Sequence, residues 1–326
     1  MRSEVMNFFK LKQTFEHLGY FETPENTQLI ENLKQDIHQG GLIIVSGIVG
    51  SGKTTLLVHV QKELQLAGQV IVSRSLSVDK EKISLGTLMT ALFYDLSTKS
   101  GVKLPTQPEK RERQLLALIK KSRKPIALFV DDAHSLQTKT LVGLKRLIEL
   151  VYQDGNILSV VLAGHPKLKN DLKRPVLEEI GARIRSALML EGIKNYQQDY
   201  IKWALTEATQ KEVDWQELIT EEALNFLAEK LATPLQVKQY LKQAFEQAYE
   251  VGQKLITIDV VETVLVKSLN DLEPQLVRYG YSVKILSQLL QVKPGEVRSF
   301  LNGQLSANQT QEMMDKILMA GIPLSS

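Results

Sequence analysis

Residues 42–55 read LIIVSGIVGSGKTT. Five apolar or small residues (42–46) run directly into the pattern G-x-x-x-x-G-K-T, and apolar residues at 56–58 and 60 then follow with the spacing of a helix. The stretch therefore predicts a strand, a phosphate-binding loop and a helix in direct succession.

The residue types of this loop suit a polyphosphate. Its glycines leave the backbone N–H groups free to turn inward onto the anion, and the helix that follows directs its positive end at the same point. Lys53 is expected to reach the β- and γ-phosphates and Thr54 to offer its hydroxyl to Mg²⁺. The alternative is an ordinary glycine-rich turn with a solvated Lys53. The candidate nucleotide-binding residues are Gly47, Ile48, Val49, Gly50, Ser51, Gly52, Lys53, Thr54 and Thr55.

Composition sets wider limits. A chain of 326 residues with 43% hydrophobic and 24% charged residues is typical of a soluble protein of two or three domains. No window approaches the ~18 apolar residues of a membrane span, and the start, MRSEVMNFFKLK, lacks the apolar segment of a secretory signal. The absence of cysteine excludes disulfides and thiolate metal sites. We expect a cytoplasmic protein with no membrane partner, and the net charge of +3 neither requires nor opposes a nucleic-acid partner.

A second motif supports the first. Residues 126–130 (IALFV) form an unbroken apolar run of the kind buried on both faces of a parallel sheet, and Asp131 and Asp132 follow it directly. A carboxylate at this end of a strand beside a phosphate loop can hold Mg²⁺, directly or through water, and Asp131 fits that role. Asp132 is placed to polarise the attacking water. Alternatively, the two acids only cap the next helix.

Further strand ends supply weaker candidates. A fourth strand at 157–163 is followed by His165, which we expect to lie between the two motif strands and to sense the γ-phosphate, unless it is purely structural. Arg183 precedes the last expected strand and is a candidate to reach the nucleotide of a neighbouring subunit. A surface or ion-paired arginine is the alternative, and it applies more strongly to Arg174 and Arg185.

The order of elements predicts the domains. Strands alternate with helices up to about residue 193, and only helices follow, which indicates an α/β domain (41–193) with a helical lid (194–269). The aromatic lead-in at 1–40 either packs on the nucleotide domain or covers the adenine base. Residues 270–326 are predicted to form a separate small helical unit.

That last unit has helix-turn-helix spacing. Helices are predicted at 283–290 and 294–301 with a three-residue turn between them, so Lys293 and Arg298 would face outward. DNA reading, protein docking and plain packing all remain open. The other candidates for DNA contact follow the second expected strand (69–73) and are Arg74, Lys80 and Lys82, which are equally well explained as solvated surface charges.

Together these motifs resemble an AAA+ ATPase of the ExeA-like group, which includes bacterial transposition regulators of the TnsC, MuB and IstB type. The resemblance spans about residues 7–268 and rests on GIVGSGKTT, IALFVDDAH, VVLAGHPKL, LKRPVLEEIGARI and LATPLQVKQYL. It implies an α/β P-loop fold with a parallel sheet flanked by helices, an α-helical lid and a small C-terminal helix-turn-helix-like domain. The roles it implies are ATP and Mg²⁺ binding by Lys53, Thr54 and Asp131, general base for Asp132, sensor 1 for His165 and arginine finger for Arg183.

The resemblance also implies a function. Transposition regulators of this group assemble with ATP into rings or helical filaments on duplex DNA and recruit a transposase. A helicase-loader-like or signalling switch that docks a protein, and an ExeA-type secretion ATPase, are the alternatives; the latter commonly carries a membrane span after the ATPase region, which is not expected here.

Two departures from the group's pattern matter. Asp132 replaces the usual glutamate and is one methylene shorter, which predicts slow ATP hydrolysis. Leu235 and Gln236 follow the lid proline, Pro234, where an arginine is common, so a charged contact from the lid to the γ-phosphate is in doubt.

Overall fold

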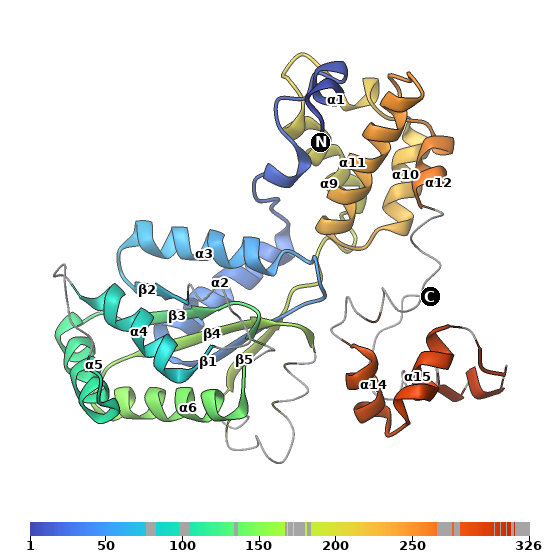
Figure 1. The fold of residues 1–326 in the computed structure, drawn as a ribbon. Coiled ribbons are helices and arrows are strands. Elements are labelled where there is room, and N and C mark those ends of the chain that lie inside the picture. Colours follow the sequence, from blue (N-terminus) through green and yellow to red (C-terminus); the bar gives the residue numbers. More distant parts are fainter. Residues whose placement is uncertain are drawn as a thin grey trace. The chain divides into compact units, whose positions relative to one another are not determined.

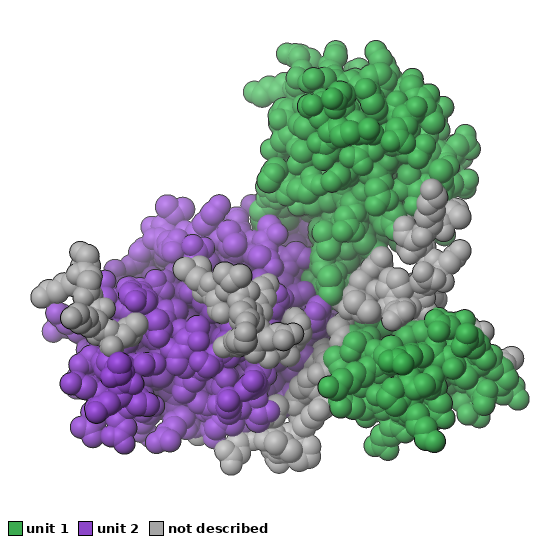
Figure 2. Space-filling model, in the orientation of Figure 1, with its two compact units in different colours: residues 1–21, 48–51, 191–326 green, residues 22–47, 52–190 purple. Residues whose placement is uncertain are grey.

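The computed structural model places most of the chain in two compact units, coloured separately in Figure 2. Unit 1 comprises Met1–Phe21, Ile48–Ser51 and Glu191–Ser326, and unit 2 comprises Glu22–Gly47 and Gly52–Leu190. The structure describes residues 1–75, 83–97, 105–133, 136–166, 168, 172, 180, 184–265, 276, 281–302, 304–306, 308–310, 312–313 and 316.

Unit 2 is built on a five-stranded sheet, and all of its pairings are parallel. Its strands lie in the order β2-β3-β4-β1-β5. The middle strands β3 and β4 are buried throughout, as the unbroken apolar run of β3 predicts, and the α/β parallel-sheet fold expected from the sequence is confirmed. The strands are β1 (Gly41–Ser46), β2 (Ile71–Arg74), β3 (Ile126–Val130), β4 (Leu158–Gly164) and β5 (Ile184–Met189).

Helices cover both faces of this sheet (Figure 1). One face carries α2 (Pro24–Gln39) and α3 (Lys53–Ala67), and the other carries α4 (Leu85–Leu96), α5 (Pro108–Ser122) and α6 (Thr138–Gln153). Local sequence fixes where they begin. Thr23 accepts the Asn26 N–H ahead of Pro24 at the first position of α2, and Ser84 caps α4 in the same way.

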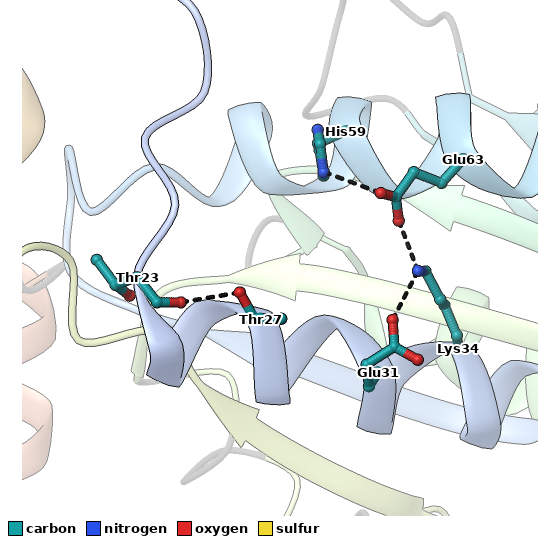
Figure 3. A network of polar contacts seen from close by, with 6 residues as sticks. All are labelled: Thr23, Thr27, Glu31, Lys34, His59 and Glu63. Atoms are coloured by element: carbon teal, nitrogen blue, oxygen red, sulfur yellow. Dashed lines mark hydrogen bonds and ion pairs between the residues drawn. The ribbon is translucent and has the colours of Figure 1, made fainter.

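A polar network joins α2 to α3, the helix that follows the phosphate loop (Figure 3). The Lys34 ammonium lies 2.8 Å from a Glu31 carboxylate oxygen and 2.6 Å from one of Glu63, and His59 Nε2 lies 3.2 Å from the other oxygen of Glu63. The hydrogen bond from Lys34 lowers the pKa of Glu63. The network therefore holds the two helices together on one face of the sheet.

The described residues of unit 1 form helices and loops with two isolated β-bridges, and no strand occurs among them, as expected after about residue 193. A lid core forms from α9 (Gln197–Ala208), α10 (Glu221–Lys230), α11 (Pro234–Glu250) and α12 (Ile258–Leu265), with the short η5 (Trp215–Glu217) between α9 and α10. The N-terminal elements α1 (Ser3–Phe8) and η1 (Phe15–His17) pack into the same core. The rings of Phe9 and Phe15 lie 4.7 and 5.2 Å from that of Phe245 on α11.

The lead-in at 1–40 is thus divided. Its second half, α2, packs on the sheet, and its first 21 residues pack on the lid helices. Neither alternative offered by the sequence included this second contact.

The C-terminal part of unit 1 has a hydrophobic cluster of its own. Helices α14 (Val283–Leu290) and α15 (Pro294–Leu301) have the bounds predicted from the sequence, and Gln291 ends α14 in the left-handed region at φ 56°. Leu286, Val297 and Phe300 are buried, while Lys293 and Arg298 are exposed. Among the described helices of the whole chain, none is long and apolar enough to span a bilayer.

Candidate nucleotide-binding site

The loop between β1 and α3 has the conformation that its glycines permit. Gly50 and Gly52 have φ values of 79° and 98°, in the region that favours glycine, and Gly52 directly precedes α3. The Gly47 N–H donates to the Gly164 carbonyl on β4 (3.2 Å), and the Ser51 N–H closes a turn on the Ile48 carbonyl (3.2 Å). Sequence and geometry therefore agree on a glycine-dependent turn at this strand end.

Lys53 is the first residue of α3 and only 8% exposed. Its ammonium donates to the Gly47 carbonyl at 2.9 Å. Burial lowers the pKa of Lys53, while the nearby charges of Asp131 and Asp132 act in the opposite direction. A buried ammonium costs free energy unless anions compensate it, so this position suits a polyanionic ligand.

Thr54 and Asp131 bring two oxygen ligands together. The Thr54 hydroxyl donates to Asp131 Oδ2 at 2.6 Å, and the other Asp131 oxygen accepts the Asp132 N–H at 2.9 Å. A hydroxyl and a carboxylate are ligands that Mg²⁺ prefers, and this ion usually completes its shell with phosphate oxygens and water. Among the described residues, no group of three or more histidine, aspartate or glutamate side chains is arranged to hold a metal ion. The donor set thus fits an ion brought in with a nucleotide.

Asp132 and His165 lie at the same edge of the sheet. Asp132 follows β3 with φ 52°, a value that is rare for a residue with a side chain. His165 follows β4, and β4 lies between β1 and β3, as the sequence predicted. The positions agree with the expected base and sensor, and the roles themselves stay predictions.

The candidate arginines differ in what the structure describes. Arg183 and Arg174 lie outside the described residues. Arg185, on β5, donates to the carbonyls of Gln39 and Gly40 and to the Gln39 side chain. It therefore caps the end of α2, which is a structural role.

Two of the five DNA-contact candidates, Lys80 and Lys82, also lie outside the described residues. Arg74 ends β2 and is exposed, and it lines a cavity of about 610 Å³ together with Lys62 of α3 and Tyr94 of α4. Lys293 and Arg298 lie in unit 1, exposed at the start and in the middle of α15.

One contact was missed by the sequence reasoning. Within unit 1, the Leu235 N–H at the start of α11 donates to the Gly50 carbonyl in the phosphate loop at 3.3 Å. The sequence signal near this contact was the motif TPLQ at 233–236, in which Thr233, Pro234 and Gln236 form a capped helix start. This motif predicts where the helix begins and does not predict what it contacts.

The sequence is similar to known proteins over part of its length. Residues 35–172 match the AAA_22 family model, described as an AAA domain. General secretion pathway protein A of Aeromonas hydrophila is 29% identical over 171 residues, which are 51% of this chain and 30% of that protein. The chain thus spans about a third of the length of this relative.

Solved structures show the same fold. The Aeropyrum pernix ORC2 protein (ADPNP-ADP complexes) is 16% identical with a TM-score of 0.60, over 96% of this chain and 85% of that one. Drosophila ORC bound to DNA is 16% identical with a TM-score of 0.55, over 99% and 80%. The Thermotoga maritima RuvB Holliday junction branch migration motor is 18% identical with a TM-score of 0.51, over 98% and 93%. The AAA-domain match covers residues 35–172, and the solved structures share the fold of the chain.

Proposed function

We propose that this protein is an ATP-switched, DNA-binding AAA+ regulator of DNA transposition. ATP bound with Mg²⁺ drives copies of the chain to assemble on duplex DNA, and the assembly recruits or activates a transposase or another recombination protein. The observation that carries the proposal is the meeting of Thr54 and Asp131 (2.6 Å) beside the buried Lys53 at one edge of the sheet.

Each residue of the site has a part in this scheme. Lys53 and the loop N–H groups bind the β- and γ-phosphates, and Thr54 and Asp131 hold the magnesium ion. When bound, the ion would neutralise charge on the phosphate oxygens. Asp132 orients the attacking water, His165 senses the γ-phosphate, and Arg183 reaches the nucleotide of a neighbouring copy. Because the Asp132 side chain is one methylene shorter than glutamate, hydrolysis is slow and the ATP-bound assembly persists.

Exposed cations support a DNA partner. Arg74 on β2 and the α15 pair Lys293 and Arg298 are accessible for phosphate contacts, and Lys80 and Lys82 follow Arg74 in the sequence. A similar fold occurs in Drosophila ORC bound to DNA. Transposition is the finer part of the proposal, and it depends on the resemblance to the TnsC, MuB and IstB regulators.

The test combines microscopy with binding. Electron micrographs of the protein with random-sequence duplex should show rings or filaments with a non-hydrolysable ATP analogue and none with ADP. Affinity for the duplex should fall by about tenfold or more between 50 and 200 mM salt, because bound phosphates release counterions. A protein that stays monomeric with the analogue, or whose affinity for the duplex does not change with salt concentration, would contradict the proposal.

Recruitment is tested separately. Analogue-assembled protein on DNA should retain a purified transposase from the same organism in co-sedimentation, and the ADP form should not. Retention that does not depend on nucleotide would exclude a switch.

The relative from Aeromonas hydrophila favours a second candidate, a secretion-type ATPase. Fractionation of cells distinguishes the two. If the protein is found with membranes and the purified protein does not bind DNA, the secretion-type ATPase would be favoured. Protein that binds DNA only through a partner would favour a helicase-loader-like or signalling switch.

A further inference from the structure

The tip of the phosphate loop packs against the first turn of α11. Residues Ile48–Ser51 belong to the same compact unit as this helix, so the contact lies inside unit 1. The Leu235 N–H, one of the N–H groups that a helix start leaves without an intrahelical partner, donates to the Gly50 carbonyl at 3.3 Å. The loop and the lid helix are therefore joined through the backbone.

Side-chain packing makes this contact close. A Cβ added to Gly50 would lie 2.6 Å from Leu235 Cβ and 3.0 Å from Thr233 Oγ1. A Cβ on Gly192, in the segment after β5, would lie 3.6 Å from Ser51 Cα and 3.7 Å from Pro234 Cδ. Gly50 thus needs to be glycine for two reasons, its φ of 79° and the absence of space beside Leu235.

The helix start that makes the contact is held firmly. Thr233 is 1% exposed and accepts the Gln236 N–H, while Gln236 Oε1 accepts the N–H groups of Ala232 and Thr233 at 3.0 and 3.2 Å. Such a satisfied buried network is rigid, so a shift of the loop tip is expected to move the start of α11 as a whole.

No basic residue occupies the first turn of α11. Leu235 and Gln236 follow Pro234, and the next basic residue is Lys238. Burial lowers the pKa of Lys238, and Glu16 of the N-terminal segment is the nearby charge that acts against this. Lys238 is thus associated with the N-terminal segment. The side chain that packs against the loop is that of Leu235, which is apolar.

We propose that Leu235 is a positioning residue that couples the lid to bound nucleotide through the backbone of the phosphate loop. The inference rests on the proposed ATP binding. Phosphates held by the loop N–H groups fix the orientation of the Gly50 peptide, and the Leu235 N–H and side chain follow it. The lid thereby responds to the nucleotide without a charged side chain on the γ-phosphate.

Tryptophan fluorescence reports this coupling. The chain has two tryptophans, Trp203 and Trp215, both in unit 1, and the Trp203 ring lies 5.2 Å from that of Phe21. A saturating non-hydrolysable ATP analogue should change their emission in the wild type. Leu235→Gly should remove most of this change at its own saturating concentration and should speed dissociation of a fluorescent (mant) ATP about fivefold, a typical coupling effect.

Leu255→Gly is the matched control, because Leu255 is also in unit 1 and is 39% exposed, against 42% for Leu235. It should keep both the emission change and the dissociation rate. A Leu235→Gly protein that melts like the wild type and still shows the full emission change would overturn the inference.

A suppressor pair tests the packing. Gly50→Ala should weaken mant-ATP binding about tenfold, because the new methyl group meets Leu235 and the backbone is strained. Adding Leu235→Gly should restore part of this loss, about threefold, since strain at φ 79° remains. No restoration would contradict the packing argument. Wild-type protein that fails to bind mant-ATP would overturn the proposed function as well, whereas binding without an emission change would overturn the coupling alone.

Discussion

The two edges of the sheet in unit 2 use charged and polar side chains in different ways. At the carboxyl edge, Lys53 is buried at 8% exposure, and Asp131 meets Thr54. At the amino edge, Arg185 is hydrogen-bonded to the end of α2. Polar groups at the amino edge complete the hydrogen bonds of a helix, whereas those at the carboxyl edge form a cluster suited to a polyanion. Substitutions should therefore affect ligand binding at one edge and stability at the other.

The largest effect is expected for Lys53→Ala. Loss of charge-assisted hydrogen bonds to two phosphates should weaken mant-ATP binding about 100-fold. The melting temperature without nucleotide should stay the same or rise, because a buried ammonium is removed. Fluorescence titration and thermal melting check this pair of results. A marked fall in melting temperature would break the contrast between the edges.

Asp132→Glu should raise the rate of hydrolysis. The longer side chain places its carboxylate nearer the attacking water, and a displacement of about 1 Å is worth up to about 100-fold in rate. We expect at least a tenfold rise in phosphate release, about 1.4 kcal/mol in the barrier, with mant-ATP affinity little changed. Asp132→Asn is the control and should remove hydrolysis. If Asp132→Glu is no faster than the wild type, chain length does not limit the reaction.

Ser159→Ala tests the amino edge. Ser159 is fully buried on β4, and its hydroxyl donates to the Ile37 carbonyl in the last turn of α2 at 2.7 Å. Removing the hydroxyl leaves a buried carbonyl without this donor, which should cost about 2 kcal/mol in the free energy of unfolding. Urea unfolding measures the loss, and the affinity for mant-ATP should stay unchanged. A loss of affinity without a loss of stability would reverse the assignment of this edge.

Arg185→Ala should have a smaller effect of the same kind. Its hydrogen bonds reach the α2 carbonyls at a partly exposed site, so we expect a cost of about 1 kcal/mol. Arg146→Ala, at an exposed arginine on α6, is the matched control and should be nearly neutral. Equal effects of the two substitutions in urea unfolding would argue against a capping role for Arg185.

Elements whose signal lies in one contiguous stretch of sequence were predicted closely. The strand at 126–130 and the helices at 283–290 and 294–301 in unit 1 have the predicted bounds. Strand β2 begins two residues later than predicted, at Ile71, because Gly68 ends α3 in the left-handed region at φ 65° and the chain must then turn. Strand β4 begins and ends one residue later and pairs Gly164 with Ser46.

Contacts between segments distant in the chain could not be predicted from the sequence. An apolar face shows that a helix is buried, and it does not show against what. The packing of residues 1–21 on the lid helices joins segments about 200 residues apart, as in the bridge between Leu11 and Thr209. The contact between Gly50 and Leu235 was missed for the same reason.

The smallest expected effect concerns Glu16 in unit 1, where a charged side chain again stabilises the fold. Burial raises the pKa of Glu16, but hydrogen bonds from its own backbone, Thr14 and Lys242 outweigh it and lower the pKa from 4.5 to about 2. Because the folded state keeps this carboxylate ionised at lower pH than the unfolded chain, the stabilisation is present above pH 4.5 and lost as the pH falls toward 2.

The Glu16 side chain is 49% exposed, so solvent screening limits the contribution to about 0.5 kcal/mol. Glu16→Gln should therefore lower the free energy of unfolding slightly at pH 6 and have less effect at pH 3, as measured by urea unfolding at both values. The same loss at both pH values would show that packing, not charge, connects Glu16 to α11. Glu16 would then differ from Arg185. The conclusion that charged groups away from the carboxyl edge stabilise the fold would hold only within unit 2.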